Sequence, residues 1–184
     1  MRFEATPVSG VFLISTDLLQ DDRGFFARIF DPDIFAAAGV PFHPCQVSLS
    51  HNRSKATLRG MHYSLTPENK LVHCTRGKIY DVALDLRRGS PTFRTWFGLE
   101  LSPKDGTGLF LAPGVAHGYL TIEPDSDVLY HTDCSFNPAA AAGVRWNDQA
   151  FGIVWPMTPA VINARDAGYP DFEISPRDHR PPAD

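Results

Sequence analysis

Short β-favouring runs separated by turn residues fill residues 8–135 and constrain the fold more than any other feature of the chain. The runs read VFLIST, FFARIF, KLVHCT, KIYDVALDL, TWFGLEL, GLFLAP, HGYLTI and DVLYHT. Many short strands with turn signals between them are typical of β-sandwiches and β-barrels. The 16 prolines and 14 glycines suit the turns that such a body needs. We therefore expect an all-β fold, with a jelly roll (a double-stranded β-helix) as the leading architecture.

Helix signals are few and short. Asp31 is suited to cap the N-terminus of a helix, Pro32 to occupy its first position, and Gly39 follows the segment IFAAA, where the helix would end. The segment NPAAAAG at residues 137–143 repeats this arrangement. We expect both segments to be small helices at the edge of the all-β body.

The length of the chain, 184 residues, suits one domain with a sizeable core. We expect a single domain over residues 1–184, in which about 174–184 form a loose tail because SPRDHRPPAD is rich in proline and charge. No apolar run approaches the about 20 residues of a membrane-spanning helix, so no membrane association is expected. The net charge of −4 leaves no basic surface for nucleic acid, so an anionic ligand would be held by a few placed cations.

The cysteines and the N-terminus indicate the compartment. Cys45, Cys74 and Cys134 are odd in number and far apart, with no C-x-x-C pair, which argues against a disulfide framework and a structural zinc site. The opening MRFEATPVSGVF lacks the apolar core of a secretory signal. We expect reduced thiols and a cytoplasmic protein.

The stretch TLRGMHY groups a cation with an imidazole. Strand alternation would place Arg59 and His62 on opposite faces, unless Gly60 permits a β-bulge that redirects one of them. Lys70 opens the next predicted strand, and a hairpin between the two strands would bring it back beside His62. His62 is then a structural residue, a metal ligand or a base beside a cation.

Two carboxylates share one face of the run KIYDVALDLR. Strict alternation places Asp81 and Asp85 together with Ile79 and Ala83, opposite the larger apolar residues. The carboxylates either face solvent and pair with nearby arginines, or they line a polar interior and orient His62 or a substrate hydroxyl.

His117 and Tyr130 add two further candidates. His117 follows a Pro-Gly turn, and Tyr130 stands in a strand where its phenol is either a proton donor or a wall residue with its hydroxyl in water. The segment PGVAH is similar to the second motif of metal-binding cupins, but the first motif needs H-x-H and the corresponding strand here reads MHYS. We therefore expect no metal site.

Together these segments resemble the dTDP-4-dehydrorhamnose 3,5-epimerase family, a metal-free branch of the cupins. The resemblance runs from DDRGFFARIF through LRGMHY, NKLVHCTRGKIYDVALDLRRGSPTF, LFLAPGVAHGYL and LYHT to WNDQAFGIVWP and ARD. Their order and spacing are specific although each segment alone is weak. The resemblance implies a cupin jelly roll that forms a homodimer with strands exchanged or paired between subunits. It also implies that a nucleotide-diphosphate sugar binds in the barrel and that no cofactor is used.

The resemblance also implies roles for individual residues. His62 matches the general base, Asp166 the carboxylate that orients it, Tyr130 the acid on the other face of the sugar, and Lys70 the cation beside the C4 oxygen. A further set matches positions that hold the diphosphate, frame the sugar or approach the nucleotide, namely Arg23, Phe25, Gln46, Ser48, Arg59 and His117.

Three positions depart from the family pattern. Arg28, which we also expect among the substrate-binding residues, stands where many members have an acidic residue near the base. Ser64 stands where Gln is usual, and Ser135 where an aromatic residue is common. These changes leave the base and the acid in place but alter their surroundings.

The implied reaction is epimerisation of a 4-keto-6-deoxy sugar at C3, C5 or both, with the substrate ketone as the electron sink. The first alternative is a 3,4-ketoisomerase that uses the same kind of acid-base chemistry. The others are a metal-dependent cupin, against which the missing H-x-H motif argues, and a binding protein that has lost catalysis.

Overall fold

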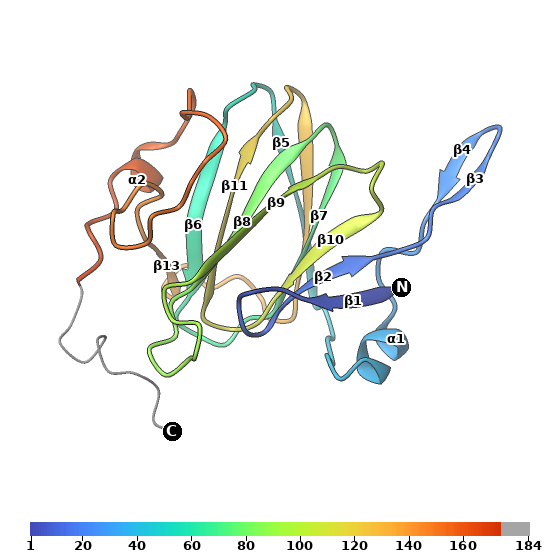
Figure 1. Ribbon diagram of the computed structural model, residues 1–184, viewed down its shortest axis with the longest axis horizontal. Coiled ribbons are helices and arrows are strands. Elements are labelled where there is room, and N and C mark those ends of the chain that lie inside the picture. Colours follow the sequence, from blue (N-terminus) through green and yellow to red (C-terminus); the bar gives the residue numbers. More distant parts are fainter. Residues whose placement is uncertain (174–184) are drawn as a thin grey trace.

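The structure is a computed structural model that describes residues 1–173, so the tail expected at about 174–184 lies outside the described residues. Two antiparallel sheets face each other, as a jelly roll requires, and the predicted all-β fold is confirmed (Figure 1). The larger sheet has the order β1 (Arg2–Ala5), β2 (Val11–Ser15), β10 (Thr107–Leu111), β7 (Lys70–Arg76), β12 (Ser126–Thr132) and β5 (Gln46–Asn52). The smaller has the order β13 (Ala141–Gly143), β6 (Leu58–Ser64), β11 (Val115–Thr121), β8 (Ile79–Asp85) and β9 (Trp96–Leu101).

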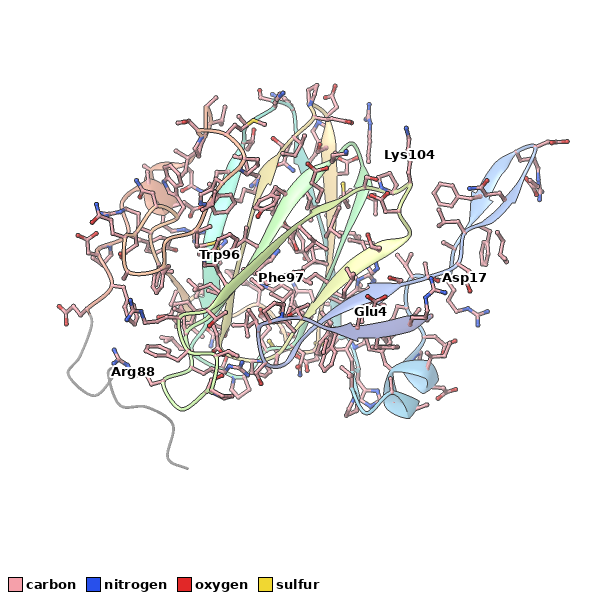
Figure 2. All side chains as sticks on the ribbon, in the orientation of Figure 1. Glu4, Asp17, Arg88, Trp96, Phe97 and Lys104 are labelled. Atoms are coloured by element: carbon pink, nitrogen blue, oxygen red, sulfur yellow. The ribbon has the colours of Figure 1, made fainter. Side chains whose placement is uncertain are left out.

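The main core lies between the two sheets and follows the period-two pattern of the strands. Ile79 and Ala83 of β8 join the inner cluster, whereas Val82 and Leu84 pack on the outer face of the same strand. Asp81 and Asp85 are buried with the inward set, as alternation predicts. On β9 the neighbours Trp96 and Phe97, labelled in Figure 2, divide in the same way, with Phe97 inside and Trp96 outside.

Separate segments cover the outer faces of the sheets. The helix α1 (Pro32–Ala37) and its flanks pack phenylalanines on the larger sheet. Residues 144–172 cross the smaller sheet and carry α2 (Ala164–Ala167) beside β6 (Figure 1). Backbone hydrogen bonds from Leu58 to Val161 and between Met61 and Val144 attach this covering segment to β6. The segment 144–172 is thereby held close to the middle of β6.

The helix at Asp31 is confirmed. The Asp31 side chain accepts hydrogen bonds from the N–H groups of Asp33 and Ile34, and Gly39 follows with a φ of 76°. A glycine suits this left-handed conformation because it carries no Cβ.

The second predicted helix, at 137–143, is wrong. Asn137 caps only a turn, and Ala141–Gly143 form β13 at the edge of β6. A run of four alanines is too short to stabilise a helix alone, whereas the open edge of β6 satisfies its backbone groups directly.

Other elements also differ from the sequence-based expectation. Only the first two residues of the predicted run FFARIF are in a strand, β4 (Gly24–Phe26), which pairs with β3 (Leu19–Asp21) in a separate hairpin. The strands β1 and β5 and the short helix α2 carry no strong local signal, and the sequence does not predict them. Across residues 1–173, no helix is long and apolar enough to span a membrane.

Candidate active site

A cavity of about 680 Å³ opens between the two sheets. Its walls include most of the residues predicted for the site, namely Gln46, Ser48, Arg59, His62, Lys70, His117 and Tyr130. Ser64 and Ser135, which depart from the family pattern, also line this cavity. Residues that are remote in sequence therefore line one polar cavity.

A β-bulge in β6 brings Arg59 and His62 to the same cavity, as the sequence suggested. His62 pairs with His117 and Arg59 with Tyr119, so three steps along β6 oppose two steps along β11. The extra residue reverses the alternation between Arg59 and His62. Both side chains consequently face inward.

Gly60 makes this bulge possible. Its φ is +125°, and a Cβ atom there would lie 2.6 Å from the Cα of Gly118 and 2.9 Å from the carbonyl oxygen of His117. Any side chain would collide with the backbone of β11 and would also strain the local conformation. Glycine is therefore required by the close approach of the two strands.

His62 forms a dyad with the buried Asp166. The Nε2 atom of His62 lies 2.8 Å from Oδ1 of Asp166, and the N–H of Gly60 donates to Oδ2 at 3.0 Å. Burial opposes ionisation of Asp166, but the hydrogen bonds from His62 and Gly60 outweigh it and lower the pKa of this carboxyl. An ionised Asp166 can only accept, so Nε2 carries the proton and Nδ1 is left as the basic atom of His62.

Asp166 is placed by the covering segment. It lies in the first turn of α2, whose N-cap Asn163 accepts a hydrogen bond from the Asp166 N–H at 2.7 Å. From local pattern alone Asp166 is only a turn residue, and the one signal for it is the resemblance of the segment ARD to the family.

Arg165 belongs to the same cluster, although the sequence does not single it out. Its Nε donates to Asp166 at 3.3 Å, and its Nη2 lies 3.3 Å from Nε2 of His62. Arg165 also lines the cavity, so a third cation stands there beside Arg59 and Lys70.

Tyr130 reaches the cavity from β12, in the sheet opposite His62. Burial, followed by the neighbouring Tyr119, raises the pKa of Tyr130 well above its ordinary value near 10. The phenol therefore keeps its proton across the neutral range, as a proton donor must.

Lys70 does not reach the site through a hairpin with β6, so that prediction is wrong. The two strands lie in different sheets, because the connection after β6 crosses to the other side of the barrel. Lys70 thus enters the cavity from the wall opposite His62. Its ammonium forms an ion pair with Glu68 at 3.2 Å, a partner that sequence reasoning missed.

The two carboxylates of β8 have different roles. Asp81 accepts from Nε2 of the buried His117 at 2.7 Å, so it orients His117 rather than His62. Asp85 binds Arg87 at 2.8 Å together with Ser90 and Thr92, which agrees with the structural interpretation for this residue.

Three predicted substrate contacts lie elsewhere in the described chain. Arg23 and Phe25 stand on the β3–β4 hairpin, which projects away from the barrel, and Arg28 follows it (Figure 1). Arg23 pairs with Asp21 and Arg28 with Asp31, outside the cavity of their own chain.

The side chains that could bind a metal ion lie apart from one another. Within residues 1–173 no three His, Cys, Asp or Glu side chains converge on one point. The three histidines that line the cavity, His51, His62 and His117, are each hydrogen-bonded to a different carboxylate.

Comparison with known proteins agrees with this geometry. The sequence model of the dTDP-4-dehydrorhamnose 3,5-epimerase family matches residues 5–174. The dTDP-4-dehydrorhamnose 3,5-epimerase of Sinorhizobium fredii is 35% identical over 94% of this chain and 90% of its own. The crystal structure of the same enzyme from Bacillus anthracis, with TDP and PPi bound, has a TM-score of 0.89 and 33% identity over 93% of this chain and 99% of that one.

A second solved structure widens the range of reactions among the relatives. ChmJ of Streptomyces bikiniensis, a 3'-monoepimerase in complex with dTDP-quinovose, has a TM-score of 0.84 and 29% identity, covering 89% of this chain and 84% of its own. The match over nearly the whole chain, together with the cavity and its His-Asp dyad, shows that this isomerase belongs to the dTDP-4-dehydrorhamnose 3,5-epimerase family.

Proposed function

We propose that the protein epimerises a dTDP-linked 4-keto-6-deoxy sugar at C3 and C5 without a cofactor, with His62 as base and Tyr130 as acid. One observation carries the proposal: His62, which is hydrogen-bonded to Asp166, and Tyr130 enter a single cavity from opposite sheets. Inversion needs a proton to leave one face of the sugar and another to arrive at the opposite face. A base and an acid on facing walls meet that requirement.

The chemistry begins at the base. Carbon-bound protons beside a ketone are weakly acidic, so their removal at neutral pH needs a placed base and stabilisation of the enolate oxygen. Nδ1 of His62 takes the proton, and Asp166 stabilises the imidazolium that forms. The Lys70 ammonium faces the C4 oxygen and balances its developing charge.

The second half of the reaction uses Tyr130. Its O–H bond breaks as a new C–H bond forms on the face away from His62, which inverts the carbon. Repetition at the second carbon next to the ketone completes the double epimerisation. The same four side chains, His62, Asp166, Lys70 and Tyr130, serve both steps.

Cations and polar groups on the cavity wall account for binding of the nucleotide diphosphate. The guanidinium of Arg59 is held by Asn52 at 2.8 Å and by the carbonyl of His51 at 3.3 Å, which leaves its remaining donors for a phosphate group. His117 frames the sugar, and the Gln46 and Ser48 side chains of β5 approach the nucleoside. Binding energy from the diphosphate holds the ring in register with the base and acid.

Dimerisation is part of the proposal because the β3–β4 hairpin leaves apolar side chains uncovered in a single chain. Leu19 and Phe26 of the hairpin are 65% and 64% exposed, and Phe25 is 50% exposed. An extended hairpin with this much apolar surface suits burial against a second copy. In that arrangement Arg23, Phe25 and Arg28 reach the cavity of the partner copy.

Epimerisation at C3 alone is the second candidate. The likeness to a 3'-monoepimerase favours it, and Ser64 and Ser135 on the cavity wall alter the space around the ring. The choice depends on whether the pocket lets the ring turn so that C5 meets His62.

The test is proton NMR of the protein with dTDP-4-keto-6-deoxyglucose in heavy water. Deuterium entering C3 and C5, with accumulation of the doubly inverted sugar, is expected. Exchange at C3 alone assigns the monoepimerase, and movement of the keto group to C3 assigns a ketoisomerase. A His62→Asn variant should show no exchange, and exchange at the wild-type rate in that variant would overturn the mechanism.

A further inference from the structure

A second phenol stands beside Tyr130 and has no part in the reaction described above. Tyr119 of β11 is 1% exposed, and its ring centroid lies 6.4 Å from that of Tyr130. Both side chains line the cavity. Tyr119 comes from the sheet that carries His62, whereas Tyr130 comes from the facing sheet, so the two phenols meet across the barrel.

The Tyr119 hydroxyl has a defined direction. It donates to Oγ of Ser50 at 3.0 Å or to Oδ1 of Asn52 at 3.2 Å. Asn52 is itself held, because its Oδ1 accepts from Nε of Arg59 and its Nδ2 donates to the carbonyl of Ser126 at 3.0 Å. With its proton turned toward Ser50 and Asn52, the Tyr119 oxygen presents a lone pair that can accept from Tyr130.

The proposed reaction removes the hydroxyl proton of Tyr130, and this proton must be replaced. After each inversion Tyr130 is a phenolate in a largely buried place, and a buried charge of this kind is costly. It must regain a proton before it can act at the second carbon. Ser50 lines the cavity and is partly exposed, so its hydroxyl can exchange with water there.

We propose that Tyr119 is a positioning residue that orients the Tyr130 hydroxyl and, together with Ser50, returns a proton to Tyr130 after each inversion. This inference rests on the proposed function, since it concerns the acid of that reaction. The proton moves from Tyr119 to the Tyr130 phenolate, from Ser50 to Tyr119, and from water to Ser50. His62 releases the proton that it took from the sugar to water, so the cycle balances.

The physical argument for this route is the strong tendency of Tyr130 to hold its proton. Burial raises the pKa of Tyr130 above the ordinary value of a phenol, so its phenolate readily takes a proton from a neighbouring hydroxyl. Hydroxyl groups both donate and accept, and each can rotate to reverse the direction of its hydrogen bond. Asn52 and Arg59 keep Tyr119 in place while this happens.

The decisive variant is Tyr119→Phe, which keeps the ring and removes only the hydroxyl. We expect kcat to fall about 10- to 100-fold, as when a charged group loses one hydrogen bond, while KM changes less than about threefold. The singly inverted sugar should accumulate, because the second inversion waits for the proton. Tyr119 helps to raise the pKa of Tyr130, so the alkaline limb of the kcat/KM profile should move to lower pH.

Two further variants provide a matched control and a second test. Tyr80→Phe is the matched control, because Tyr80 packs on the outer face of β8 against Trp155 and should leave kcat unchanged. Ser50→Ala removes the link to water but keeps both tyrosines. It should lower kcat about 3- to 10-fold, the loss expected for one hydrogen bond. If Tyr119→Phe does not fold, Ser50→Ala tests the inference by itself.

The outcomes separate this inference from the proposed function. Wild-type protein that exchanges no sugar proton overturns both. Active wild-type protein with unchanged kcat and pH profile in Tyr119→Phe overturns the inference alone, and a lowered Tm with no change in either quantity would show that the Tyr119 hydroxyl only stabilises the fold.

Discussion

Asp166 accepts a 2.8 Å hydrogen bond from Nε2 of His62, although 104 positions separate the two residues in the chain. The bond selects the histidine tautomer and leaves Nδ1 as the basic atom of a side chain that lines the cavity. The buried carboxylate is useful there because it remains ionised: hydrogen bonds from His62 and Gly60 overcome the cost of burial.

Replacing Asp166 by Asn should lower kcat about 100- to 10,000-fold, the range typical of lost acid-base catalysis. The amide neither stabilises the imidazolium nor favours the Nε2–H tautomer. KM should change little, because Asp166 lies behind His62. Steady-state kinetics would measure both constants. Asp85→Asn is the matched control, since Asp85 is also buried but binds only Arg87 and the following loop; equal losses in the two variants would contradict a specific role for Asp166.

Tyr130→Phe should separate proton removal from inversion. His62 still takes the sugar proton and returns a deuteron to the same face, so the substrate acquires deuterium with its configuration retained. Inverted product should fall at least about 100-fold. NMR in heavy water distinguishes labelled substrate from product, and a normal yield of inverted sugar would exclude Tyr130 as the acid.

Gly60→Ala should disrupt the bulge that joins Arg59 and His62. The added Cβ meets the backbone of Gly118 at 2.6 Å in a conformation that alanine rarely adopts, so we expect a loss of at least about 2 kcal/mol in the free energy of unfolding. Denaturant unfolding would measure it. Gly89→Ala is the control, because a Cβ atom at Gly89 would have no neighbour within 4 Å among the described residues, and the stability of that variant should be unchanged.

The β3–β4 hairpin should contribute to binding only in an assembled dimer. Arg23→Ala is expected to raise KM about tenfold with little change in kcat, as when one charged hydrogen-bonding group to a phosphate is lost. Arg2→Ala removes a comparable exposed arginine, which pairs with Asp17, and should not alter KM. Phe26→Ser should shift the protein toward monomer in sedimentation velocity, and a wild-type protein that is monomeric at every concentration would contradict the assembly.

Stability should fall between pH 7 and pH 5 because of His73. Burial, together with His131, lowers the pKa of His73 to about 4, and its Nδ1 has no hydrogen-bond partner within residues 1–173. Below about pH 6.5 His73 is therefore protonated in the unfolded chain, whereas in the folded chain it stays neutral until the pH approaches 4. This difference lowers the free energy of unfolding by about 2 kcal/mol at pH 5. Guanidinium unfolding at the two pH values would show the loss, and it should shrink in His73→Gln but persist in His43→Gln, where the histidine is exposed.

Local pattern determined the broad fold of this protein. Alternation in KIYDVALDLR correctly divided β8 into an inner and an outer face, and Asp31, Pro32 and Gly39 correctly marked a helix. Both signals act over a few neighbouring residues, where side-chain direction and capping chemistry decide the conformation. The alanine run at 137–143 misled for the same reason, because an open strand edge elsewhere in the chain outweighed a weak local preference.

The site depended on tertiary structure. Gly60 showed where a bulge was possible, but only the approach of β11 decided that Arg59 and His62 share a face. The sequence contained His62, Lys70 and Tyr130 as separate candidates, and their resemblance to a family suggested their roles. Their placement on facing walls followed from the crossing between sheets after β6, and the arrival of Asp166 behind His62 followed from a covering segment pinned to β6. Contacts between such distant residues arise when the sheets close on each other, so no local stretch of the chain encodes them.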